Sequence, residues 1–432
     1  MSAELRQHPT GHLPGPLTAA DIDAAAARIA GVVQPTPLQY SDRLSAQTGA
    51  HVYLKREDLQ AVRSYKLRGA YNLLVQLSES ELGAGVVCSS AGNHAQGFAF
   101  ACRSLGVHGR VYVPAKTPQQ KRDRIRYHGG DFIELIVGGA TYDLAAEAAL
   151  ADVIRTGATL VPPYDDLRTM AGQGTIAVEI LDQLGQHNAE PDLLVVPVGG
   201  GGCISGTTTY LRERTDHCTV LGIEPAGAAC MMAALAAGEL VSLDHVDQFV
   251  DGAAVRRAGA LPFAMLSAAG DMVSVTTVDE GAVCTAMLDL YQNEGIIAEP
   301  AGALSVAGLL EADIAPGSTV VCLISGGNND VSRYGEILER SLVHRGLKHY
   351  FLVDFPQEPG ALRRFLDEVL GPGDDVTLFE YVKRNNRETG EALVGVQLGS
   401  ANDLAGLMAR MRDSQLQVEV LEPGSPAYRY LL

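Results

Sequence analysis

A lysine at position 66 stands within a short stretch of small, aromatic and glycine residues, 64–70 (SYKLRGA). A β-type run at 51–54 precedes it and a helical pattern over 70–77 follows it, so the backbone can hold the side chain rigidly. Partial desolvation lowers the pKa of an amine toward the range in which the amine is nucleophilic. The stretch therefore predicts a reactive amine at Lys66, with a solvated surface lysine as the alternative.

Three loops, each directly after a strand-like apolar run, offer groups of a second kind. The first is 89–94 (SSAGNH), which is followed by a helical pattern. Small residues at a helix start leave N–H groups available to an anion. A carboxylate would suit the N–H groups of this loop, at Ser90, Ala91, Gly92 and Asn93. The amide of Asn93 can also donate a hydrogen bond to a ring hydroxyl.

The second loop is a run of four glycines, 199–202, between the apolar run 193–198 and a helical pattern over 204–211. Without Cβ atoms the backbone can close around an anion, which predicts a phosphate cradle. The third loop, 325–328 (SGGN), follows the apolar run 320–324. For each loop taken singly, a tight turn between strand and helix is the alternative. Together with the lysine, the loops supply what a pyridoxal phosphate ring requires.

In this order and spacing the motifs resemble the fold-type II pyridoxal phosphate enzymes, and most closely the threonine dehydratase (threonine ammonia-lyase) family, over residues 17–345. The resemblance implies that Lys66 is the Schiff-base lysine, that Asn93 bonds the phenolic oxygen of the cofactor, and that Ser325 bonds its pyridine nitrogen. It implies that the phosphate is held by the glycine loop and the next residue, Gly199, Gly200, Gly201, Gly202 and Cys203. The family often has leucine in place of Cys203, where only the backbone N–H is needed.

Composition predicts an acidic cytoplasmic enzyme of more than one domain. The chain has 432 residues, 47% of them hydrophobic, and a net charge of −18, which argues against nucleic acid as a partner. Seven cysteines without a Cys-x-x-Cys pair predict reduced core residues, and the histidines show no metal-ligand spacing, so no metal site is predicted. Residues 1–16 predict a flexible arm without a secretory signal. The uncharged run 193–211 is too rich in glycine and threonine to span a membrane.

Alternating strand and helix patterns predict an α/β fold with open parallel sheets, whose ligands gather beyond the carboxyl ends of the strands. All three glycine-containing loops fall at such ends. The resemblance implies a two-lobed, tryptophan synthase β-like catalytic domain over 17–345. A small lobe at about 56–166 would be inserted in the larger lobe, with the cofactor in the cleft between them.

The pattern changes at residue 346, where a regulatory domain over 346–432 is predicted. Strand and helix patterns occur in the ferredoxin-like order strand-helix-strand-strand-helix-strand, at 350–355, 360–370, 376–382, 392–398, 401–412 and 417–421. Two stretches, 355–362 (FPQEPGAL) and 371–379 (GPGDDVTLF), resemble the ACT-like module of biosynthetic threonine dehydratases. The resemblance implies isoleucine as the effector, with valine as a second candidate, and a homotetramer. A simple dimerisation domain is the alternative.

The predicted reaction is deamination of L-threonine to 2-oxobutanoate and ammonia, the first step of isoleucine biosynthesis. Lys66 would act as the general base, and the neutral Ser325 hydroxyl favours elimination over transamination. Serine dehydratase and serine racemase of the same fold are the alternatives within the enzyme class. The racemase is disfavoured because Cys230 stands where a second metal-binding acid would follow Glu224. A non-catalytic amino-acid-binding regulator is the alternative outside that class.

Overall fold

The computed structural model describes residues 15–381, 388–414, 416–422, 425 and 427–428. The chain divides into two compact units, Met1–Asn329 and Asp330–Leu432, here called the first and second units. The predicted flexible arm, 1–16, lies outside the described residues except for its last two positions. No helix in the described part of the chain is long and apolar enough to cross a membrane.

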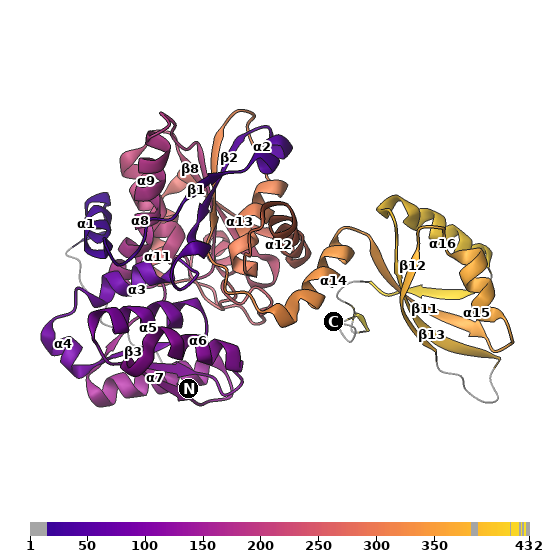
Figure 1. The fold of residues 1–432 in the computed structure, drawn as a ribbon, viewed down its shortest axis with the longest axis horizontal. Coiled ribbons are helices and arrows are strands. Elements are labelled where there is room, and N and C mark those ends of the chain that lie inside the picture. The colour runs from indigo at the N-terminus through magenta and orange to yellow at the C-terminus, as the bar shows by residue number, and fades with distance from the viewer. Residues whose placement is uncertain (1–14, 382–387, 415, 423–424, 426, 429–432) are drawn as a thin grey trace. The chain divides into compact units, whose positions relative to one another are not determined.

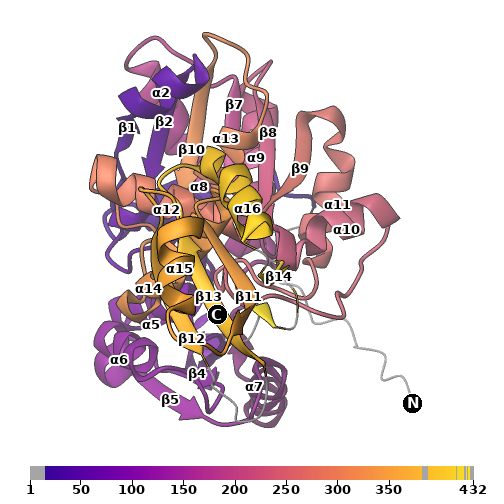
Figure 2. The same ribbon diagram turned by 90° about the vertical axis from the view of Figure 1, so that its right-hand side faces the viewer.

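The first unit contains a six-stranded sheet (Figure 1), in which the strands have the order β1-β2-β10-β7-β8-β9, all labelled in Figure 2. Its strands are β1 (Leu38–Tyr40), β2 (His51–Arg56), β7 (Leu193–Pro197), β8 (Thr219–Pro225), β9 (Val273–Val278) and β10 (Thr319–Ile324). All neighbouring pairs are parallel except β1 with β2, which is antiparallel. The register aligns Val320 with Val52 on one side and with Leu193 on the other, so the carboxyl ends of β10 and β7 meet at one edge.

A second, wholly parallel sheet of four strands has the order β5-β4-β3-β6. Its strands are β3 (Val86–Ser89), β4 (Gly109–Val113), β5 (Ile133–Val137) and β6 (Thr159–Leu160). All four strands lie within the small lobe predicted at 56–166. The bounds of that lobe stay a prediction, but the α/β class with parallel sheets is confirmed.

Thirteen described α-helices of the first unit cover these sheets. They are α1 (Ala19–Ile29), α2 (Asp42–Thr48), α3 (Lys66–Leu74), α4 (Glu79–Ala84), α5 (Asn93–Leu105), α6 (Gln119–Gly129), α7 (Tyr142–Thr156), α8 (Leu167–Gly185), α9 (Gly202–Arg214), α10 (Cys230–Ala237), α11 (Ala260–Ala268), α12 (Glu280–Glu294) and α13 (Pro300–Glu311). Thr18 caps α1 in a reciprocal arrangement with Asp21. The hydrophobic core between α8, α9 and the large sheet includes Ile176, Ile204 and Val196.

The second unit has the predicted ferredoxin-like order of elements. After α14 (Tyr334–His344) come β11 (Lys348–Pro356), α15 (Ala361–Arg364), a π-helical turn (Phe365–Val369), β12 (Asp375–Tyr381), β13 (Thr389–Gln397), α16 (Leu404–Asp413) and β14 (Gln417–Val420). The strands form an antiparallel sheet in the order β12-β13-β11-β14. Figure 2 shows α15 and α16 together in front of this sheet.

The division between the two units falls earlier than the predicted boundary at 345/346. Glu339 of α14 accepts a hydrogen bond from the Tyr350 hydroxyl at 2.7 Å and also pairs with Lys348. These contacts join α14 to β11, so α14 lies in the second unit. The sequence pattern places α14 with the first unit because the strand-helix alternation runs on to its end. The bounds of the functional domains stay a prediction.

Candidate active site

Lys66 is the first residue of α3, and two neighbouring helices fix that helix end. A Cβ atom at Gly97 of α5 would lie 2.8 Å from the Leu67 nitrogen, so α5 approaches the start of α3 through a missing side chain. A Cβ atom at Gly172 of α8 would lie 2.4 Å from the Arg68 carbonyl oxygen. Contacts this close leave the helix start little freedom to shift. The lysine is thereby placed by packing on two sides.

The Lys66 amine is partly buried and its pKa is lowered to about 8. Burial is the main cause, because it penalises the charged form, and the nearby Cys203 and Glu299 side chains oppose part of the shift. Nζ donates a hydrogen bond to the Pro163 carbonyl at 3.2 Å and lies 5.1 Å from the centre of the Tyr65 ring. A substantial fraction of this amine is therefore neutral near pH 8, as a nucleophile or base requires.

Asn93, the first residue of α5, forms hydrogen bonds with two other polar side chains. Its Nδ2 donates to Oε1 of Glu299 at 2.5 Å, and its Oδ1 accepts from Nδ2 of Asn328 at 2.8 Å. Glu299 is 5% exposed, and burial, followed by the charge of Asp251, raises its pKa to about 7. The rest of the predicted carboxylate loop, Ser90, Ala91 and Gly92, is partly buried just before the helix.

The glycine loop after β7 leads directly into α9. Gly201 has a positive φ of 92°, which strains any other residue, and a Cβ atom at Gly200 would lie 2.4 Å from the Tyr164 ring. The first N–H groups of α9, at Gly202, Cys203 and Ile204, have no intrahelical acceptor. The Cys203 side chain is buried, which raises the pKa of its thiol to about 12. An anion at this loop would meet backbone N–H groups and a neutral side chain.

The loop after β10 joins the lysine segment through the backbone. Tyr65 donates its N–H to the Ser325 carbonyl at 3.2 Å, and Ser64 forms a β-bridge with Gly326. The Ser325 side chain is buried, and its hydroxyl donates to the Ala301 carbonyl at 3.2 Å. The structure thus brings Ser325 beside the segment that carries Lys66.

Contacts and electrostatic interactions connect the predicted residues around Lys66. Cys203 and Glu299 both influence its pKa, Glu299 bonds Asn93, and the backbone of Tyr65 bonds that of Ser325. Sequence reasoning missed Glu299 and gave Asn328 no role. The only local signal for Glu299 is the following Pro300, typical of a helix start. Within the described residues, no group of three or more His, Cys, Asp or Glu side chains has the arrangement of a metal site.

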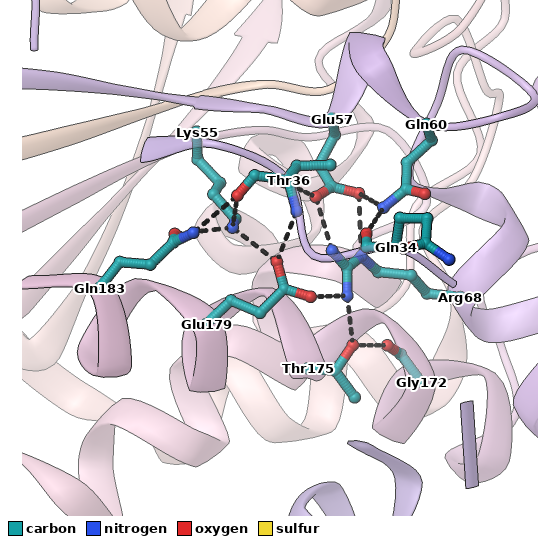
Figure 3. A network of polar contacts seen from close by, with 10 residues as sticks. All are labelled: Gln34, Thr36, Lys55, Glu57, Gln60, Arg68, Gly172, Thr175, Glu179 and Gln183. Atoms are coloured by element: carbon teal, nitrogen blue, oxygen red, sulfur yellow. Dashed lines mark hydrogen bonds and ion pairs between the residues drawn. The ribbon is translucent and has the colours of Figure 1, made fainter. Parts of the chain in front are cut away.

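A buried ionic network around Arg68, two residues after Lys66 in the chain, was also missed by the sequence prediction (Figure 3). Arg68, fully buried on α3, forms a bidentate pair with Glu57 at 2.9 and 2.7 Å and bonds Glu179 of α8 at 2.7 Å. Lys55 of β2 bonds the other Glu179 oxygen at 2.6 Å. The Thr36 hydroxyl donates to Glu57 at 2.6 Å. The network ties α3, two residues beyond Lys66, to the large sheet and to α8.

These residues fit pyridoxal phosphate on structural grounds. A lysine amine with a lowered pKa is the group that bonds the cofactor's aldehyde. The loop before α9 offers backbone N–H donors to a phosphate. It leaves no room for a side chain at Gly200 or at Gly202; a Cβ atom at Gly202 would lie 2.8 Å from Oε1 of Gln173. Ser325 and Asn93 add a hydroxyl and an amide. Lys66, Asn93 and Ser325 would hold the ring, and the glycine loop its phosphate.

Two protein-family models match the chain. The model described as "Pyridoxal-phosphate dependent enzyme" matches residues 29–326. The chain belongs to this family. The model described as "C-terminal regulatory domain of Threonine dehydratase" matches residues 339–431, which include every strand of the second unit. The predicted family, cofactor and two-part fold are thereby confirmed.

Two relatives and a solved structure are similar to this chain over most of its length. The chain is 82% identical over 432 residues to the L-threonine dehydratase biosynthetic IlvA of Mycobacterium tuberculosis (strain ATCC 25618 / H37Rv), covering 100% of both chains. It is 60% identical to the protein of that name from Corynebacterium glutamicum, over 96% of this chain and 95% of the relative. The processed form of threonine deaminase isoform 2 from Solanum lycopersicum superposes with a TM-score of 0.69 and 34% identity, over 78% of this chain and 99% of that one.

Proposed function

We propose that the protein deaminates L-threonine to 2-oxobutanoate and ammonia with pyridoxal phosphate as cofactor, in the biosynthesis of isoleucine. The observation that carries this proposal is the partly buried Lys66 amine, whose pKa is lowered to about 8. It interacts electrostatically with Cys203, which follows the glycine loop, and with Glu299, which bonds Asn93. Relatives at 60–82% identity over nearly the whole chain bear the name L-threonine dehydratase, which supports threonine as the substrate.

Pyridoxal phosphate, when bound, would withdraw electron density from the substrate's Cα atom and so acidify its C–H bond. The amine of Lys66, released when the substrate's amino group takes its place on the cofactor, would remove that proton, and the hydroxyl group would leave from Cβ. The loop of Ser90, Ala91 and Gly92, before α5, holds the substrate carboxylate. The Ser325 hydroxyl offers a neutral partner to the cofactor's ring nitrogen, which favours rapid loss of the β-hydroxyl over transfer of the amino group. This loss leaves an enamine, which tautomerises to an imine, and hydrolysis of the imine gives 2-oxobutanoate and ammonia.

The second unit binds an amino-acid effector, and isoleucine is the effector proposed. The match to a threonine dehydratase regulatory domain supports this role. Isoleucine is the amino acid that 2-oxobutanoate serves to make, so its binding would oppose threonine turnover. Valine is the second candidate, and a homotetramer is the proposed assembly.

The direct test replaces the proposed base. Lys66→Ala is expected to lower the rate of 2-oxobutanoate formation by more than about 1,000-fold, because one amine both anchors the cofactor and moves the proton. Lys116→Ala, at an exposed lysine, is the matched control and is expected to keep the full rate. Normal turnover by the Lys66 variant would rule out the assignment. Steady-state rates for threonine and serine, each with isoleucine or valine, separate the threonine enzyme from a serine dehydratase.

A further inference from the structure

We infer that Glu299 is a positioning residue which, together with Asn328, orients the Asn93 amide so that one of its N–H bonds is presented to the cofactor ring. This inference rests on the proposed function, in which Asn93 bonds the cofactor. Asn93 forms side-chain hydrogen bonds with Glu299, 206 residues away in the sequence, and with Asn328, 235 residues away. The three side chains come from the start of α5, the residue before α13, and the loop after β10.

The direction of each hydrogen bond follows from groups that have only one role. The Val62 carbonyl can only accept, so the group of Asn328 that faces it at 2.8 Å must be the NH2 group. The same nitrogen donates its other hydrogen to Asn93 at 2.8 Å, so the Asn93 atom facing it must be the carbonyl oxygen Oδ1. The NH2 group of Asn93 is thereby turned away from Asn328.

Glu299 fixes the same orientation from the other side. Ionised Glu299, the main form at pH 8, accepts but cannot donate, and its Oε1 lies 2.5 Å from Nδ2 of Asn93. One hydrogen of Nδ2 is used in this bond. The described residues provide no other hydrogen-bond acceptor for Nδ2. The second hydrogen is therefore available to an oxygen of the cofactor ring.

The backbone around Glu299 is built for close approach to this loop. The Glu299 N–H donates to the Gly326 carbonyl at 3.1 Å. A Cβ atom at Gly326 would lie 2.4 Å from Oε1 of Glu299, and one at Gly302 would lie 2.1 Å from the Gly326 oxygen. A side chain at Gly326 would displace the Glu299 carboxylate, and one at Gly302 would displace the Gly326 carbonyl, which accepts the Glu299 N–H. The placement of Glu299 thus depends on two missing side chains.

If Glu299 served only to stabilise the fold, its substitution would lower the stability of the chain. Burial raises the pKa of Glu299 to about 7, so its ionised form opposes folding above that pH. Glu299→Met, which keeps the length and removes both the charge and the acceptor, is expected to fold at least as stably as the unaltered chain at pH 8. Weaker cofactor binding by a chain of equal or greater stability is the signature of a positioning role.

The test measures the dissociation constant of pyridoxal phosphate for the cofactor-free full chain and the visible absorbance of the bound cofactor. Glu299→Met is expected to weaken binding roughly tenfold or more and to shift the absorbance band, because a charge-assisted hydrogen bond is lost. Glu299→Gln, which keeps an acceptor oxygen, is expected to bind within about threefold of the unaltered chain. Thermal unfolding without cofactor reports stability for each variant.

A double-mutant cycle with Asn93→Ala decides whether Glu299 acts through Asn93. In that background Glu299→Met is expected to change the dissociation constant by less than about twofold. An equal loss in both backgrounds, or unchanged binding and absorbance in Glu299→Met, would overturn the inference. A chain that binds the cofactor and deaminates threonine while Glu299→Met has no effect contradicts only the inference. An unaltered chain without cofactor binding or turnover contradicts the proposed function instead.

Discussion

Two buried carboxyl groups, those of Glu224 and Glu299, make the stability of the folded chain depend on pH. Glu224 is 0% exposed and accepts the N–H groups of Met231 and Met232, both at 2.8 Å. Burial raises its pKa to about 7, as it does for Glu299. A carboxyl with a raised pKa binds its proton more tightly in the folded chain. Its contribution to stability is complete below about pH 4.5 and is lost as the pH rises through about 7.

Glu299→Gln is therefore expected to flatten the fall in unfolding free energy of the cofactor-free chain between pH 5 and pH 7.5. The buried carboxyl accounts for a loss on the order of 2 kcal/mol over that interval, and a neutral amide has none. Urea unfolding at several pH values measures the effect. Glu224 is unaltered in this variant, so part of the slope must remain. An identical pH profile for both chains would contradict the raised pKa.

At the residue scale, the sequence predicts the site residues that lie on short local motifs. It does not predict the residues whose role depends on a contact with a distant part of the chain. Lys66, Asn93, Ser325 and the four glycines follow strand-like runs, and each motif is complete within a few residues. Glu299 acquires its role only through a contact 206 residues away, which no local spacing encodes. Arg68 belongs to the motif 64–70 that contains Lys66, but its partner Glu179 is 111 residues away in the chain.

At the scale of elements, packing overrides local propensity. The sequence pattern predicts the helix after the lysine over 70–77, which leaves out Gly69, a poor helix former. In the structure α3 begins at Lys66 and includes Gly69, where a Cβ atom would lie 2.8 Å from the Thr169 oxygen of α8. Close contact with α8 requires a glycine there. The helix thus starts at the lysine because tertiary contacts place it there.

The close packing of α5 against α3 predicts the effect of adding a side chain at Gly97. Gly97→Ala is expected to lower stability and the turnover rate together, because its Cβ atom would lie 2.8 Å from the Leu67 nitrogen and would displace the start of α3. Gly83→Ala is the matched control, because a Cβ atom on α4 meets nothing within 4 Å and should stabilise the chain by about 0.4–1 kcal/mol. Thermal unfolding and threonine turnover measure both. Equal behaviour of the two variants would show that the contact does not constrain Lys66.

The buried ionic network makes a second prediction for α3. Arg68→Met leaves Glu57, itself fully buried, without its bidentate partner, and is expected to cost about 3–5 kcal/mol of unfolding free energy. The double variant Arg68→Met/Glu57→Met removes both charges and should recover much of that loss. Arg126→Ala breaks the exposed pair with Asp123 and should cost less than about 1 kcal/mol. A double variant as unstable as the single one would indicate a packing role for Arg68 instead.

At the scale of the whole molecule, the chain consists of two units with separate cores. The first unit holds every predicted cofactor and catalytic residue. The second has its own core on one sheet, with Phe351, Phe365, Val394 and Leu407 all buried. Phe355 packs edge-on against Phe365 and Phe379 within that core. A unit with a core of its own can respond to a ligand as one body, as an effector domain must.

This division predicts where isoleucine acts. A chain ending at Asn329 is expected to deaminate threonine without inhibition by isoleucine, whereas the full chain should be inhibited. The coupling between two ligand sites is typically about 1–3 kcal/mol, so isoleucine should raise the threonine concentration for half-maximal rate by roughly 5–150-fold in the full chain. Because such coupling is reciprocal, a non-reacting threonine analogue should weaken isoleucine binding by a similar factor.

The position of the cut matters because α14 belongs to the second unit, bonded to β11 through Glu339. A chain ending at Arg345 retains α14 without its partner strand and serves as the comparison. If the chain ending at Asn329 is active and still inhibited, the effector site lies in the first unit. Isothermal titration of isoleucine into residues 330–432 alone gives an independent measurement, since this unit has its own core. Binding there, together with uninhibited turnover by the shortened chain, would locate the regulatory site in the second unit.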